Sequence, residues 1–134
     1  MVSKDSIHVL VVDDEPDIVE IIAFSFKHAG FSQVHTASSG NQAAAIAKTI
    51  PFDIVVTDVR MPDGDGLSLL AELKKTYAKP PLVVFLTAFA DLTVEEAQRL
   101  GALGLLSKPF DLNKVVSLCT EEHEKRVLAE ASQG

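Results

Sequence analysis

Five short apolar runs recur along the chain, and each is followed by a stretch with helical periodicity. Three runs are strong and two are weaker; they span residues 7–12, 54–57 and 82–86, and residues 33–36 and 102–106. The strong runs are almost continuously apolar instead of alternating, which is typical of strands buried on both faces. This alternation predicts a parallel sheet, because parallel neighbours are joined by helical crossovers.

The helical stretches lie at residues 15–29, 39–49, 66–77 and 93–100, with a fifth that runs from residue 111 into the 120s. The first of them carries Ile18, Ile21, Ile22 and Ser25 on one face. Asp65 and Asp111 are suitable N-caps, and Gly30 and Gly101 are suitable stop signals. The predicted fold class is therefore α/β: a five-stranded parallel sheet with helices on both faces, in a (βα)5 flavodoxin-like topology.

Composition restricts the function. The 134 residues suffice for one compact domain, and 12 basic against 19 acidic residues give a net charge of −7, which disfavours general nucleic-acid binding. No apolar run approaches the roughly 18 residues of a membrane span, and the polar N-terminus lacks a signal-peptide core. One cysteine excludes an internal disulfide and a cysteine-based zinc site. We therefore expect a soluble, cytoplasmic domain.

Polar residues follow the ends of the apolar runs. Asp13 and Asp14 follow the first strong run, Asp58 the second and Thr87 the third, while Lys108 follows the last weak run. In open α/β sheets, functional groups collect at the carboxyl ends of the strands. Three carboxylates, one hydroxyl and one ammonium group are therefore predicted to converge at a single edge.

Such a cluster favours a bound cation. Two like charges about 4 Å apart repel by about 4 kcal/mol at an effective dielectric constant near 20. One lysine does not neutralise three acids, and a set of hard oxygen ligands suits Mg²⁺. A carboxylate can also attack phosphorus and form an aspartyl phosphate, whose oxygens Mg²⁺, Lys108 and the Thr87 hydroxyl would neutralise and orient.

Four motifs in order give the chain a family resemblance. They are VVDDEP at residues 11–16, DVRMPDGDG at residues 58–66, TA at residues 87–88 and KPF at residues 108–110. With these motifs the chain resembles a response-regulator receiver domain of two-component signalling. The resemblance covers residues 7–120, which leaves residues 1–6 as an N-terminal tail and residues 121–134 as a helix extension or C-terminal tail.

The resemblance implies a role for each site residue. In a receiver, Asp58 would accept a phosphoryl group from a phosphohistidine on a sensor histidine kinase or phosphotransfer protein. Mg²⁺ would be held by Asp14, Asp58 and the backbone carbonyl of Arg60, with Asp13 completing the acidic pocket. Thr87 would move toward the phosphoryl group and Lys108 would pair with it.

The resemblance also implies a signalling switch and not an enzyme, since its chemistry is limited to its own phosphotransfer and dephosphorylation. A homodimer or a downstream protein would bind the face formed by the fourth helix, fifth strand and fifth helix, and no direct nucleic-acid or membrane binding is expected. Two alternatives share the topology: a flavodoxin-like cofactor-binding protein and a non-phosphorylated pseudo-receiver scaffold. A flavin phosphate would be repelled by the acidic loop at residues 13–17.

Three positions depart from the family pattern. Leu105 replaces the usual aromatic switch residue, which predicts weak coupling of phosphorylation to the signalling face. Gly64 replaces a common apolar packing residue, which predicts a looser loop. Arg60 and Phe89 flank the approach of water to the phosphoryl group, and this pair predicts slow dephosphorylation.

Overall fold

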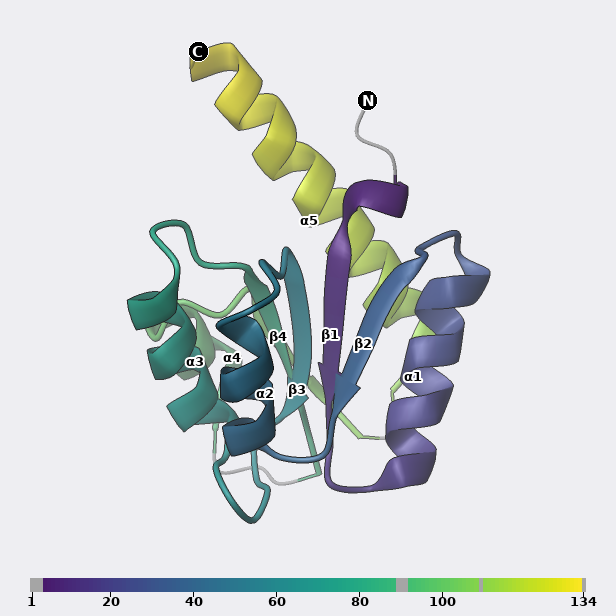
Figure 1. The fold of residues 1–134 in the computed structure, drawn as a ribbon, viewed down its shortest axis with the longest axis vertical. Coiled ribbons are helices and arrows are strands. Elements are labelled where there is room, and N and C mark those ends of the chain that lie inside the picture. Colours follow the sequence, from purple (N-terminus) through teal and green to yellow (C-terminus); the bar gives the residue numbers. More distant parts are fainter. Residues whose placement is uncertain (1–3, 89–91, 109, 134) are drawn as a thin grey trace.

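The computed structural model describes residues 4–88, 92–108 and 110–133. Its strands are β1 (His8–Val12), β2 (Gln33–Ala37), β3 (Ile54–Asp58), β4 (Leu82–Thr87) and β5 (Gly104–Ser107). Its helices are the 3-10 turn η1 (Lys4–Ser6) and α1 (Pro16–His28), α2 (Gly40–Ala47), α3 (Gly66–Thr76), α4 (Val94–Arg99) and α5 (Leu112–Gln133). The strands form one parallel sheet in the order β2-β1-β3-β4-β5 (Figure 1). The predicted fold class is confirmed.

The sheet separates two apolar cores. Successive residues of β1 alternate between them, so that Leu10 packs toward α2, α3 and α4, whereas Val9 and Val11 pack toward α1 and α5. The residues of β3 and β4 are fully buried on both sides. This two-sided burial explains why the strong runs are continuously apolar.

The buried face of α1 differs from the predicted one. The buried residues are Val19, Ile22, Ala23 and Phe26. The predicted face was Ile18, Ile21, Ile22 and Ser25, and it is wrong at Ile21, which is 48% exposed. Phe26 decides the orientation of the helix, because its ring packs edge-on against Phe31 with centroids 5.5 Å apart.

Helix α5 continues past the sheet. It runs without interruption to Gln133 and ends beyond the amino-terminal ends of the strands (Figure 1). Arg126 of this extension donates a hydrogen bond to the carbonyl of Pro80 at 2.7 Å, and Lys79 and Glu130 form an ion pair. These contacts fasten the extension to the loop before β4.

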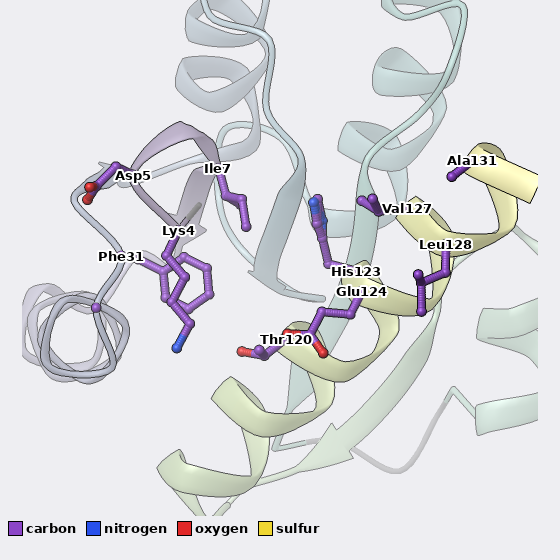
Figure 2. Close-up of a pocket in the computed structure, with 11 residues that line it drawn as sticks. Lys4, Asp5, Ile7, Phe31, Thr120, His123, Glu124, Val127, Leu128 and Ala131 are labelled. Atoms are coloured by element: carbon purple, nitrogen blue, oxygen red, sulfur yellow. The ribbon is translucent and has the colours of Figure 1, made fainter. Parts of the chain in front are cut away.

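A cavity of about 740 Å³ lies between this extension and the N-terminal part of the chain (Figure 2). Its apolar lining includes Ile7, Phe31, Val127 and Leu128. Ile7 and Phe31 both precede strands, so the cavity lies at the amino-terminal edge of the sheet. It is therefore at the end of the molecule opposite to the predicted site.

Candidate functional site

The carboxyl-terminal edge of the sheet brings the predicted residues together. Asp58 and Thr87 are the last residues of β3 and β4, and Asp13 and Lys108 directly follow β1 and β5. Because all strands run in the same direction, these four residues meet at one edge. Asp14 follows Asp13 in the loop to α1 and is exposed.

Lys108 links two of the carboxylates. Its Nζ lies 3.0 Å from Oδ2 of Asp13 and 3.2 Å from Oδ2 of Asp58. Both acids are buried, with exposed fractions of 1% and 6%. The other oxygen of Asp13, Oδ1, accepts a hydrogen bond from the backbone N–H of Glu15 at 2.9 Å. Each carboxylate oxygen of Asp13 therefore has a hydrogen-bond donor, and one of these donors, Lys108, also contacts Asp58.

The acidic cluster fits a hard cation. Asp13, Asp14 and Asp58 each offer a carboxylate oxygen, and these oxygens lie within 4.8 Å of one another. Lys108 contacts two of these three carboxylates, and its single positive charge does not balance three negative charges. An all-oxygen donor set with excess negative charge is the chemistry that Mg²⁺ prefers.

Burial and charge shift two pKa values at this edge. Burial raises the pKa of Asp58, and the nearby Asp13 carboxylate adds to the rise, although the hydrogen bond from Lys108 opposes it. For Lys108, burial favours the neutral form, but the hydrogen bonds to Asp13 and Asp58 outweigh it and raise the pKa. The lysine is therefore a cation at neutral pH. The ionised form of Asp58 is disfavoured in the folded state relative to its protonated form.

The backbone around Asp58 is closely packed. The N–H of Val59 donates to the carbonyl of Leu86 at 3.2 Å, and the N–H of Gly66 donates to the carbonyl of Val59 at 2.8 Å. A Cβ atom at position 66 would lie 2.3 Å from the carbonyl oxygen of Asp58, so only glycine fits there. The end of the loop after β3 therefore packs directly against the backbone of Asp58.

Thr87 and Lys108 are tied to each other through the backbone. The N–H of Lys108 donates to the carbonyl of Thr87 at 2.7 Å, and Thr87 is 1% exposed. Arg60 is exposed and lies in the loop after β3. The prediction that rests on Phe89 falls on a position outside the described residues.

The sequence does not predict one segment that contacts the loops of the proposed site. Residues 37–41, between β2 and α2, make backbone hydrogen bonds to Asp13 in the loop after β1 and to residues 63 and 64 in the loop after β3. The sequence signal was weak: a serine N-cap followed by Gly40 at the start of an alanine-rich helix. The predicted catalytic and metal-binding side chains gave no reason to include this segment.

Comparison with known proteins identifies the family. The model of the family described as "Response regulator receiver domain" matches residues 9–120. The chain belongs to this family. The matched residues include every residue of the acidic cluster as well as Thr87 and Lys108.

Curated relatives agree with the family match. The chain is 36% identical over 108 residues to Regulatory protein AtoC of Escherichia coli strain K12, a match covering 80% of the chain and 23% of that protein. It is 37% identical over 112 residues to Response regulator protein PilR of Pseudomonas aeruginosa, a match covering 81% of the chain and 24% of that protein. The chain thus spans about a quarter of the length of these two relatives.

Solved structures have the same fold. The receiver domain of the Francisella response regulator 1452 superposes with a TM-score of 0.80 at 29% identity, covering 90% of this chain and 99% of that one. The CheX-CheY-BeF3-Mg complex from Borrelia burgdorferi gives a TM-score of 0.77 at 29% identity, covering 86% and 87%.

The domain is therefore a receiver domain of two-component response regulators, a signalling module with a phosphoaccepting switch fold. The flavodoxin-like and pseudo-receiver alternatives are not favoured. Wherever the chain is described, no helix combines the length and the apolar character that a bilayer span requires.

Proposed function

We propose that Asp58 is the phosphoacceptor of this receiver and that the reaction depends on Mg²⁺. The observation that carries the proposal is the contact of Lys108 with both Asp13 and Asp58, beside Asp14, at the carboxyl-terminal edge of the sheet. The donor would be a phosphohistidine on a sensor histidine kinase or a histidine phosphotransfer protein.

The transfer exchanges one bond to phosphorus for another. A carboxylate oxygen of Asp58 attacks phosphorus as the nitrogen–phosphorus bond of the phosphohistidine breaks, and the imidazole leaves with the bonding electron pair. The surroundings of Asp58 favour its reaction as a nucleophile, because burial and the Asp13 charge destabilise its ionised form. Forming the acyl phosphate removes the negative charge of the Asp58 carboxylate and leaves the charge of the transferred group on the phosphoryl oxygens.

Each neighbouring group has a proposed role. Asp13, Asp14 and Asp58, with the backbone carbonyl of Arg60, would hold Mg²⁺, which supplies charge neutralisation at the phosphoryl oxygens when bound. Lys108 gives up its bond to Asp58 and pairs with the incoming phosphoryl group. Thr87 donates its hydroxyl hydrogen to another phosphoryl oxygen.

The output would be a change in binding. We place the module at residues 7–120 and assign residues 121–134 to a helix extension. Its chemistry is limited to its own phosphorylation and dephosphorylation, so it is a cytoplasmic switch and not an enzyme with an external substrate. The single cysteine, Cys119, is a buried free thiol.

A second copy or a downstream protein would bind the face formed by α4, β5 and α5. Val94 and Leu100 on and next to α4 are 41% and 43% exposed, which leaves apolar surface there. Leu105 is partly buried against the core that contains α3 and α4. It offers neither a ring nor a hydroxyl group, so we expect readout to pass mainly through Thr87.

The chemistry is tested with acetyl phosphate and purified protein. Wild type should gain one hydroxylamine-labile phosphoryl group in the presence of Mg²⁺ and none with a chelator, as measured by intact mass. Asp58→Asn should gain none. Asp63→Asn is the matched control, because Asp63 is an exposed acid of the same loop whose positive φ asparagine tolerates. Equal labelling of Asp58→Asn and wild type would exclude the assignment.

A further inference from the structure

One short segment connects the loop after β1 to the loop after β3 through backbone hydrogen bonds, without contributing a side chain to the proposed site. We call residues 37–41 the brace. At one end, the carbonyl of Ala37 accepts a hydrogen bond from the N–H of Asp13 at 3.2 Å. At the other end, the N–H groups of Gly40 and Asn41 donate to the carbonyls of Gly64 and Asp63 at 2.8 and 3.1 Å.

The brace is held rigidly by the start of α2. The side chain of Ser39 accepts a hydrogen bond from the N–H of Gln42 at 3.1 Å. The side chain of Gln42 reaches back and accepts one from the N–H of Ser38 at 2.6 Å. Reciprocal capping of this kind fixes the first turn of a helix. The brace therefore has little freedom to lengthen or shorten.

Contact between the brace and the loop after β3 is backbone against backbone. A Cβ atom at Gly40 would lie 2.4 Å from the carbonyl oxygen of Gly64 and 2.9 Å from that of Asp65. Gly64 has a φ of +99°, and a Cβ there would meet Asn41. The loop is therefore held by these contacts, and the expectation that Gly64 loosens it stays a prediction.

We propose that the brace sets the separation between the Asp13–Asp14 pair and the loop that follows Asp58, and that Gly40 is a positioning residue for Mg²⁺. This inference rests on the proposed function. Moving the Gly64 carbonyl from 2.4 Å to an ordinary contact of 3.4 Å requires a shift of about 1 Å. Mg²⁺ demands near-ideal octahedral geometry, so displacing one set of ligands against the other weakens its binding.

The test measures the Mg²⁺ affinity of the unphosphorylated protein by calorimetry. Gly40→Ala should bind Mg²⁺ about 10-fold more weakly than wild type, as is usual when groups that orient ligands are disturbed. The helix itself is not weakened, because alanine is favoured over glycine in a helix. Gly104→Ala is the matched control, since a Cβ there meets nothing within 4 Å, and its affinity should stay within about twofold of wild type.

Equal affinities of Gly40→Ala and wild type would overturn the role of the brace. A wild type that binds no Mg²⁺ would instead overturn the proposed function, so the two failures are distinguishable.

A second measurement uses wild type alone and remains available if Gly40→Ala does not fold. Opening of the brace and Mg²⁺ binding are linked equilibria, so if the opened form binds Mg²⁺ about 10-fold more weakly, saturating Mg²⁺ should slow amide hydrogen exchange at Gly40 and Asn41 about 10-fold. Exchange at the exposed end of α5 should not change. Identical exchange rates at Gly40 with and without Mg²⁺, in a protein that binds the ion, would contradict the inference.

Discussion

The two edges of the sheet are built in opposite ways. At the carboxyl-terminal edge, three carboxylates and Lys108 crowd together, and buried Asp58 has a raised pKa. At the amino-terminal edge, a cavity of about 740 Å³ is lined by both apolar and polar side chains, and the Lys79–Glu130 ion pair lies nearby. The first edge concentrates like charge at a cost in stability, whereas the second combines apolar surface with an exposed ion pair.

Strand polarity, and not cavity size, therefore points to the proposed site. The cavity of about 740 Å³ lies far from the acidic cluster, and burial lowers the pKa of His123 in its wall, which favours the neutral ring. Side chains at the carboxyl ends of parallel strands converge whatever the helices do. Substitutions at each edge separate their contributions by experiment.

The largest effect is expected for the exposed member of the acidic cluster. Asp14→Ala should weaken Mg²⁺ binding by about 10- to 100-fold, because it removes a proposed ligand without opening the core. Calorimetric titration measures the affinity. Asp17→Ala is the control, since Asp17 is an exposed acid in the first turn of α1 outside the cluster. An unchanged affinity in Asp14→Ala would remove this residue from the site.

Removing the lysine should destabilise the carboxyl-terminal edge. Lys108→Met should lower the free energy of unfolding by about 2 kcal/mol without Mg²⁺, because Asp13 and Asp58 lose a charged hydrogen-bond donor. Added Mg²⁺ should restore part of this loss. Urea unfolding with and without Mg²⁺ measures both effects, and a loss that Mg²⁺ leaves unchanged would contradict the cation site.

Neutralising Asp58 should have the opposite sign. Burial raises the pKa of Asp58, so its ionised form destabilises the folded state at neutral pH. Asp58→Asn should therefore raise the free energy of unfolding at pH 7 by about 1 kcal/mol, a modest value because the hydrogen bond from Lys108 opposes the rise in pKa. The gain should shrink as the pH falls from the raised pKa of Asp58, and it should vanish below the ordinary carboxyl pKa.

Thermal unfolding of wild type and Asp58→Asn across this pH range checks the sign. A gain of about 1 kcal/mol corresponds to a Tm higher by about 3–5 °C for a domain of this size. A variant less stable than wild type at pH 7 would show that Asp58 stabilises the metal-free fold.

The smallest effect is expected at the amino-terminal edge. Glu130→Gln removes the ion pair with Lys79, whose two side chains are 57% and 46% exposed. Exposed pairs contribute little, so the free energy of unfolding should fall by about 0.5 kcal/mol, and less at high salt. Mg²⁺ affinity should not change. A loss of Mg²⁺ binding in Glu130→Gln would show that the two edges are coupled.

The sequence predicted that acidic, hydroxyl and ammonium side chains meet at the carboxyl-terminal edge, since most of the proposed site residues end or closely follow an apolar run. It predicted the helices less completely, because packing decides the rotation of α1 through Phe26 and Phe31. The brace was not predictable, since its contacts are made by backbone atoms of residues about 25 positions apart. Residue types alone carry little information about such contacts.

The most direct test of the central claim locates the phosphoryl group on the chain. Borohydride reduces an aspartyl phosphate to homoserine, which fragmentation of proteolytic peptides then locates. Protein treated with acetyl phosphate and Mg²⁺ should carry homoserine at position 58, and the modification should be absent when a chelator replaces Mg²⁺. Homoserine at position 13, 14 or 63 in place of 58 would contradict the assignment of Asp58 as phosphoacceptor.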